Sequence, residues 1–349
     1  MDTKPTTILT GFLGAGKTTY LNHLLKSKPN IRYAIIENEY GEQSIDSELI
    51  LRAEDDIVEL NNGCLCCTLN DNLYDILNKL FTRKSEYEEV LIEATGVADP
   101  RGLADPFITI PAIKKQFPIT RIICLIDASL IEEQLQETKE AISQITFSDI
   151  LLVNKTDLVS EKYLSELREK LQKLNPLAKI VFGNQDSFPL IEIEAHNPQL
   201  DDIFFENHDH DHGHHHDHHH HHDNDNDGDQ SFPIKKPHSH HPHEHTDEVV
   251  SFTLFFDRPF DFATLQHRLL VFLMFQAKDL YRMKGLIWLH DNDQQCLLQS
   301  VGKRLVIEQK RPWEKDEIKQ SKIVFIGRKI KREPLEKIFG QCFAEVKSN

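Results

Sequence analysis

Short apolar runs alternate with longer amphipathic segments through the first half of the chain. Runs rich in aliphatic and β-branched residues, bounded by turn residues, predict buried strands at 6–10, 31–36, 56–60, 89–93, 121–127, 149–153 and 179–182. Between them, apolar residues recur at helical spacing over 19–25, 70–81, 130–143 and 162–174. Strands that alternate with helices predict an α/β fold with a doubly wound, mainly parallel sheet.

The pattern changes twice in the second half. From His208 to His222, eleven of fifteen residues are histidine and three are aspartate. So polar a run cannot bury a core, and it predicts a disordered linker. Apolar patterning returns as strands at 249–256, 285–290, 295–301 and 322–326 and helices at 261–275 and 334–339, which predict a small α+β domain. The predicted division is therefore 1–200, 201–247 and 248–349.

The first candidate site follows the first strand. Residues 11–18 read GFLGAGKT and fit the phosphate-binding loop G-x-x-x-x-G-K-[ST] between a strand and a helix. Glycines allow backbone N–H groups to surround phosphate oxygens, and the helix N-terminus adds a positive dipole. We expect Lys17 to reach the β- and γ-phosphates and Thr18 to hold Mg²⁺; an accidental glycine-rich turn is the alternative. The expected phosphate-binding residues are Gly11, Gly14, Ala15, Gly16, Lys17, Thr18 and Thr19.

Two later segments predict the rest of a nucleotide switch. Glu93 ends a predicted strand and Gly96 follows three residues later, an arrangement expected to sense the γ-phosphate. Together with Lys17 these two are the candidate catalytic residues. Asn154-Lys155-Thr156-Asp157 follows another strand and fits N-K-x-D. Asp157 would accept two hydrogen bonds that guanine donates and adenine does not, while Asn154 and Lys155 brace the loop, so the predicted nucleotide is GTP.

Three cysteines suggest a metal site. Cys64, Cys66 and Cys67 follow the turn Asn61-Asn62-Gly63, and thiolates favour Zn²⁺ or Cu(I). Three thiolates need a further ligand from a carboxylate or a partner protein; buried inert cysteines or a redox switch are the alternatives.

Two other groups of side chains are candidate metal ligands. Glu37, Glu39 and Glu42 follow the second strand and would bind Mg²⁺ or contribute to a second metal site, or else form a solvated acidic loop. The histidine tract predicts collection of divalent metals, against a merely solvated linker. Its candidate ligands are His208, His210, His212, His214, His215 and His216.

Charge and hydropathy exclude some partners. The net charge is −16, and residues 201–248 contribute 13 acidic side chains against two lysines. Because neither part offers a basic surface, we expect no nucleic-acid partner. The longest strongly apolar run, 269–275, is too short to span a bilayer, and the N-terminus has no signal-peptide core. We therefore expect no membrane association and a cytoplasmic location.

The motifs GFLGAGKTT, ENEYGE, GCLCC, EATGVADP and NKTD, in this order, resemble the CobW-type metallochaperone GTPases, which are related to nickel-enzyme assembly GTPases. The resemblance covers nearly the whole chain apart from the histidine-rich insert. It implies GTP hydrolysis coupled to delivery of zinc or cobalt to a client protein. It also implies that Cys64, Cys66 and Cys67 bind the metal and that the Glu37–Glu42 segment couples metal to nucleotide.

The functional hypothesis is a GTP-hydrolysing metallochaperone that transfers a divalent metal, Zn²⁺ before Co²⁺ or Ni²⁺, to a metal-dependent client. A slow intrinsic rate is expected, because no glutamine follows Gly96 to position the attacking water. Two alternatives stay open: a cobalt-directed assembly factor for cobalamin synthesis, and a zinc-storage protein that acts through the histidine tract. A second copy of the chain is a further candidate partner.

Overall fold

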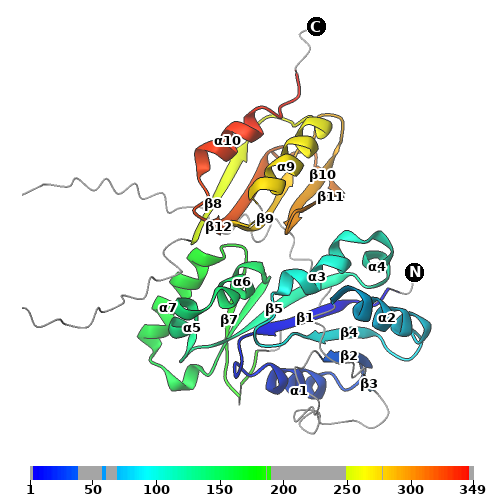
Figure 1. Ribbon diagram of the computed structural model, residues 1–349, viewed down its shortest axis with the longest axis vertical. Coiled ribbons are helices and arrows are strands. Elements are labelled where there is room, and N and C mark those ends of the chain that lie inside the picture. The colour runs from blue at the N-terminus through cyan, green and yellow to red at the C-terminus, as the bar shows by residue number, and fades with distance from the viewer. Residues whose placement is uncertain are drawn as a thin grey trace, which may run out of the picture.

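A computed structural model describes residues 3–37, 57–59, 69–185, 187–189, 249–276 and 278–345. It consists of a larger N-terminal body and a smaller C-terminal body that lies against it (Figure 1). The domain boundaries expected at 200/201 and 247/248 lie outside the described residues. No helix in the described ranges is long and apolar enough to cross a membrane.

The N-terminal body is built on a seven-stranded sheet with the order β3-β2-β4-β1-β5-β6-β7. Every pairing in it is parallel, which confirms the predicted fold class. The strands are β1 (Thr6–Gly11), β2 (Tyr33–Glu37), β3 (Ile57–Glu59), β4 (Glu89–Glu93), β5 (Ile119–Asp127), β6 (Ile150–Asn154) and β7 (Lys179–Phe182).

Helices cover both faces of this sheet, and they differ from the prediction in two places. The predicted helix 130–143 is two helices, because Thr138 ends the first and caps the second by accepting a hydrogen bond from the N–H of Ala141. Two further helices follow β4 and were not predicted; Pro106 lies inside the first of them. The helices are α1 (Lys17–Ser27), α2 (Leu69–Thr82), α3 (Pro100–Thr109), α4 (Pro111–Gln116), α5 (Ile131–Glu137), α6 (Lys139–Phe147), α7 (Glu161–Leu174) and the 3₁₀ turn η2 (Thr156–Leu158).

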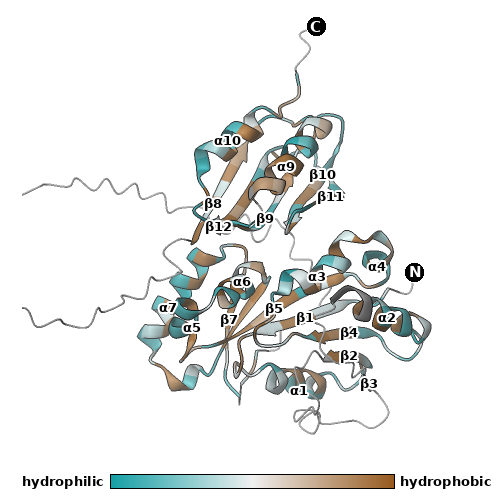
Figure 2. Ribbon diagram, viewed as in Figure 1, coloured by the Kyte–Doolittle hydropathy of each residue, from teal (hydrophilic) through white to brown (hydrophobic). Residues whose placement is uncertain are grey.

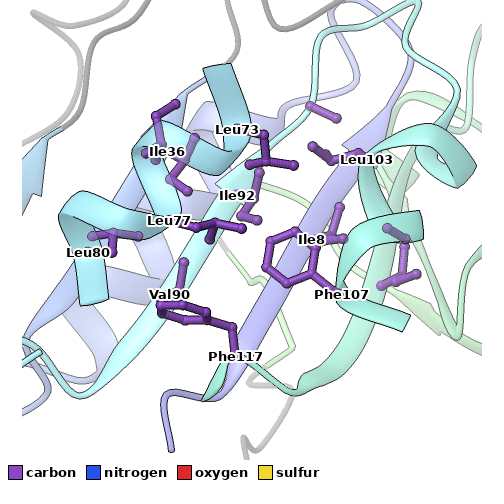
Figure 3. Packing of buried hydrophobic residues seen from close by; sticks show 14 of the residues in the cluster. Ile8, Ile36, Leu73, Leu77, Leu80, Val90, Ile92, Leu103, Phe107 and Phe117 are labelled. Carbon is purple, nitrogen blue, oxygen red and sulfur yellow. The ribbon is translucent and has the colours of Figure 1, made fainter. Parts of the chain in front are cut away.

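Neighbouring residues of the central strand β1 pack into different hydrophobic cores. Ile8 packs with residues of α2 and α3, as Figure 3 shows, whereas Leu9 packs with residues of α1 on the opposite face. Both side chains are fully buried. The strands are accordingly apolar on both faces (Figure 2), as a sheet covered on both sides requires. Each such aliphatic side chain contributes about 1.5–3 kcal/mol of transfer free energy.

The C-terminal body is a five-stranded antiparallel sheet with the order β11-β10-β9-β12-β8. Its elements are β8 (Val249–Phe256), α9 (Phe262–Gln276), β9 (Leu280–Ile287), β10 (Gln294–Val301), β11 (Arg304–Pro312), β12 (Ser321–Arg328) and α10 (Arg332–Gly340). The predicted α+β class is confirmed. The strand expected at 285–290 begins earlier, at Leu280, and the edge strand β11 was not predicted because charged residues dilute its apolar pattern.

The two faces of the second sheet have different neighbours. Apolar side chains of α9 and α10, among them Leu269 and Phe339, pack on one face. The other face contributes Leu286, Leu297 and Val324 to a cluster with Leu177 of the N-terminal body. The second sheet therefore lies between its own helices and the N-terminal body (Figure 1).

Candidate functional site

The predicted nucleotide motifs meet at one edge of the parallel sheet. Gly11, Glu93 and Asn154 are the last residues of β1, β4 and β6. Because the carboxyl ends of parallel strands lie on the same side of a sheet, the segments that follow them share one ligand-binding edge.

The phosphate loop has the backbone expected of it. Gly14 and Gly16 have φ values of 76° and 98°, in the region that side chains disfavour. The ammonium of Lys17 is buried and donates to the carbonyl oxygens of Gly11 (3.1 Å) and Phe12 (3.3 Å). Helix α1 begins at Lys17, with Thr19 exposed in its first turn. This loop fits a nucleotide's phosphate groups through its backbone curvature and its lysine.

Two close approaches bring the predicted γ-phosphate sensor to the phosphate loop. The hydroxyl of Thr18 donates to the Glu93 carboxylate at 3.0 Å, so the predicted Mg²⁺ ligand and the predicted sensor are direct neighbours. Gly96 packs against the phosphate loop, because a Cβ at this position would lie 2.7 Å from the backbone nitrogen of Leu13. The structure therefore brings together Lys17, Thr18, Glu93 and Gly96.

The base-selecting loop is tied to the phosphate loop. The Nδ2 of Asn154 donates to the carbonyl oxygen of Ala15 at 2.9 Å, and its buried Oδ1 has no hydrogen-bond partner among the described residues. Asp157 is exposed in η2, where a ligand can reach its carboxylate. These positions fit the bracing and base-binding roles predicted for them.

Lys155 is held by a residue that the sequence reading did not select. Its ammonium lies 2.6 Å from the carboxylate of Asp127, a buried residue at the end of β5. Burial alone would raise the pKa of Asp127, but hydrogen bonds from Lys155 and Ser129 hold the pKa below its usual value. The same rule that pointed to Glu93, an acid at the carboxyl end of a buried strand, would have found Asp127.

Residues of α6 hold the loop that contains Gly96. The Nε2 of Gln144 donates to the carbonyl oxygens of Gly96 (3.1 Å) and Ala98 (3.2 Å), and the hydroxyl of Ser143 donates to Asp99 (2.9 Å). Nothing in the sequence marks these two helix residues, because their partners are more than 40 positions away.

Most of the predicted metal ligands lie outside the described residues. These are Glu39, Glu42, Cys64, Cys66, Cys67, His208, His210, His212, His214, His215 and His216. Glu37 is described as the last residue of β2, and its Cα is the register partner of Glu93 in β4. Strand β3, which precedes the cysteine segment, pairs with β2.

The cysteines in the described ranges are not candidates for the metal site. Cys124, Cys296 and Cys342 are buried and free. Burial raises the pKa of Cys124 to about 12, which keeps this thiol protonated, and Cys124 is a core residue as predicted. Among the described residues no group of three His, Cys, Asp or Glu side chains could hold a metal ion.

Strand order, phosphate loop, γ-phosphate sensor and base-selecting loop together define a P-loop GTPase. Comparison with known proteins agrees. Residues 5–182 match the family described as the CobW/HypB/UreG nucleotide-binding domain, and residues 249–343 match the cobalamin synthesis protein CobW C-terminal domain. The chain belongs to the CobW/HypB/UreG family, as the sequence motifs predicted.

The relatives span most of the chain. The zinc chaperone YjiA of Escherichia coli is 30% identical over 337 residues, which cover 95% of this chain and 96% of YjiA. The zinc-regulated GTPase metalloprotein activator 1 of Schizosaccharomyces pombe is 36% identical over 208 residues, covering 56% of this chain and half (50%) of the activator. A crystal structure of zinc-bound YjiA GTPase from E. coli superposes with a TM-score of 0.64 at 26% identity, covering 99% of this chain and 100% of that one.

Proposed function

We propose that this chain is a GTP-hydrolysing metallochaperone that binds Zn²⁺ and transfers it to a metal-dependent client protein. We further propose the division made from the sequence: a GTPase domain at 1–200, a histidine-rich metal-binding linker at 201–247 and a CobW-type C-terminal domain at 248–349. The two family matches, at 5–182 and 249–343, support this division.

One observation carries the proposal: the register of β2 and β4 pairs Glu37 with Glu93. Glu93 accepts a hydrogen bond from Thr18, in the phosphate loop, and Glu37 begins the acidic segment that leads toward the cysteines. Strand β3 lies on the other side of β2, and Cys64 follows its last residue by five positions. A displacement of Glu93 in β4 would thus reach the acidic segment directly through β2, and the cysteine segment through β2 and β3.

Each group of residues has its own role in the proposed mechanism. A bound GTP supplies the terminal phosphate whose presence or loss the protein reads. Lys17 and the loop amides bind the phosphates, while Thr18 and Glu93 hold Mg²⁺ and its water. Asn154 and Lys155 position the base-selecting loop, and Asp157 selects guanine. Cys64, Cys66 and Cys67 carry the metal, which is the cargo of the reaction.

The relatives favour zinc over cobalt as this cargo. Relatives that match over most of their length, among them YjiA of E. coli and CobW of Pseudomonas aeruginosa, are named zinc chaperones. Another YjiA crystal structure is zinc-bound although one glutamate and two cysteines are replaced by alanine. Zinc bound to a protein of this family therefore does not identify the coupled site, and the test must measure the effect of nucleotide.

The decisive experiment measures Zn²⁺ affinity in a variant that lacks residues 208–245, with a non-hydrolysable GTP analogue and with GDP. We expect the two affinities to differ by about tenfold, because allosteric coupling of this kind is typically about 1–3 kcal/mol. The Cys66→Ser/Cys67→Ser double variant should lose the difference, whereas Cys296→Ser, at a buried thiol of the second domain, should keep it.

The same experiment separates the alternatives. Equal affinities in both nucleotide states would contradict the chaperone mechanism. Loss of nearly all bound metal on removal of the histidine tract would identify a zinc store. Tighter nucleotide-dependent binding of Co²⁺ than of Zn²⁺ would identify a cobalt assembly factor.

A further inference from the structure

A cavity of about 320 Å³ lies between the two domains, away from the nucleotide edge. Its walls on the N-terminal side come from α3, α4, β5, the end of α6 and the segment between α6 and β6. On the C-terminal side they come from β9, β10 and β11, on the sheet face opposite α9 and α10 (Figure 1). The cavity is large enough for a small organic molecule.

Six charged side chains line this cavity: Lys114, Asp149, Arg282, Lys284, Glu308 and Lys310. They form two groups of three, each with one carboxylate between two cations. Asp149 lies 2.7 Å from the Arg282 guanidinium and 3.5 Å from the Lys284 ammonium. Glu308 contacts Lys114 and lies 3.2 Å from Lys310. Four positive charges therefore face two negative ones.

These charges have limited access to water. The side chains of Arg282, Lys284 and Asp149 are 8%, 13% and 19% exposed, and those of the second group are 20–33% exposed. Burial lowers the pKa of Lys284, although the negative charge of Asp149 acts in the opposite direction. A cation at this position is therefore poorly hydrated. An uncompensated positive charge of this kind is a strong attractor for anions, since the low-dielectric walls screen it little.

The remaining walls are largely apolar. Phe107, Ile122 and Phe147 line the cavity from the first domain, and Leu297 and Val301 line it from the second. These side chains cannot hydrogen-bond an inorganic ion, but they can cover a hydrocarbon group. A ligand that complements this lining needs a charge of about −2 to balance the cations and a compact apolar body to fill the rest of the cavity.

We propose that this interdomain cavity binds a small organic dianion, with acidic groups that pair with Lys284 and Lys310 and an apolar body packed on Phe107 and Leu297. The ligand contacts both domains at once. This cavity is distinct from the nucleotide site, since none of the described phosphate-loop or base-selecting residues lines it.

The test titrates three probes into the metal-free full-length protein by calorimetry. The pH is about 7.5–8, at which both acids of a dicarboxylate are ionised. Phenylsuccinate carries both the charges and the ring, succinate only the charges, and 2-phenylethanol only the ring. We expect one molecule of phenylsuccinate to bind per chain, with succinate weaker by at least about tenfold because it lacks the apolar contact. 2-Phenylethanol should not bind measurably.

Two variants locate the binding. Lys284→Met and Lys310→Met should each weaken phenylsuccinate by at least about tenfold, the usual effect of losing one charged hydrogen-bond partner. Lys303→Met removes an exposed lysine outside the cavity and should have no effect, and Lys17→Ala should have none because the phosphate loop is not the site. Of the two substituted lysines, Lys310 is the more exposed, so its variant is informative even if Lys284→Met folds poorly.

Absence of saturable phenylsuccinate binding, or equal binding by wild type and the two cavity variants, would overturn the proposal. Loss of binding only in Lys17→Ala would place the ligand in the phosphate loop and would equally overturn it. None of these outcomes depends on whether the protein hydrolyses GTP or carries zinc.

Discussion

Gly96 shows how one residue can set the geometry of the site. The loop after β4 approaches the phosphate loop so closely that even a methyl group would collide with the backbone of Leu13, 2.7 Å from its nitrogen and 2.9 Å from its Cα. The two nearest atoms belong to the backbone of Leu13, which cannot move aside as the end of a flexible side chain can. Because the two loops are in contact, we expect the Gly96 N–H to respond to a terminal phosphate.

Gly96→Ala should therefore separate the sensor from the phosphate loop. We expect kcat for GTP hydrolysis to fall by at least about tenfold, about 1.4 kcal/mol in the barrier, while GDP affinity changes little. Gly340→Ala is the matched control, because no atom lies within 4 Å of its added Cβ; there we expect unchanged kcat and a stability equal to or up to about 1 kcal/mol above wild type. Unchanged hydrolysis in Gly96→Ala would contradict the assigned role.

Helix α6 connects the loop that contains Gly96 to the second domain. Near its middle, Ser143 and Gln144 hydrogen-bond the segment from Gly96 to Asp99. At its end, the carbonyl oxygens of Phe147 and Ser148 accept hydrogen bonds from Arg282 of the second domain. One short helix thus contacts both the loop of the predicted γ-phosphate sensor and the second domain, so we expect it to transmit nucleotide state.

Gln144→Ala tests this connection. The change leaves the carbonyl oxygens of Gly96 and Ala98 without that donor, at a cost of about 1–3 kcal/mol to the ordered loop. We expect kcat for GTP hydrolysis to fall about three- to tenfold with little change in nucleotide affinity. In the control Thr146→Val, the lost hydroxyl bonds only carbonyl oxygens of the same helix, so kcat should stay near wild type even if stability falls.

The two domains are joined by charged groups as well as by apolar contact. Asp149, just before β6, pairs with Arg282 and Lys284 of β9, and Arg304 of β11 lies 3.0 Å from Asp105 of α3. Burial alone would raise the pKa of Asp149, but Lys284 and Arg282 outweigh it and hold the pKa below its usual value of 3.8. The ionised carboxylate is therefore part of what holds the domains together.

The pH dependence follows from the direction of this shift. A carboxyl group whose pKa is lower in the folded state stabilises the fold above its unfolded pKa, and this contribution is lost as the pH falls through the folded value. We expect Asp149→Asn to lower stability at pH 7 by about 3 kcal/mol, because it leaves two buried cations without their carboxylate. The difference from wild type should shrink as the pH is lowered below about 4.

Thermal unfolding of both proteins between pH 7 and pH 3 measures this effect. Glu336→Gln is a suitable control, since Glu336 pairs with Arg332 at 3.4 Å on the surface of α10 and exposed pairs contribute about 0–1 kcal/mol. A constant difference between Asp149→Asn and wild type at every pH would show that the lost interaction is not the charge.

Local patterning sufficed for the parts of the molecule whose conformation depends on adjacent residues. The phosphate loop was predictable because its glycines meet a backbone requirement within eight positions. The parallel strands were predictable because each is a short run rich in aliphatic and β-branched residues. Patterning failed at Thr138, which ends one helix and caps the next, and at α3, a helix that contains Pro106. It also failed at the edge strand β11, where one face carries charged residues such as Glu308 and Lys310.

The sequence by itself determined the family and the fold class, because both are encoded in contiguous motifs and in the spacing of hydrophobic residues. It also predicts the nucleotide-binding residues, and their roles stay a prediction. Only the tertiary structure decided how these motifs are connected. The pair Arg282–Asp149 spans 133 positions and the bond from Gln144 to Gly96 spans 48, and no local pattern specifies such partners. Which charges surround the interdomain cavity is likewise a consequence of how two independently patterned sheets pack, since buried charges acquire their partners only when the domains meet.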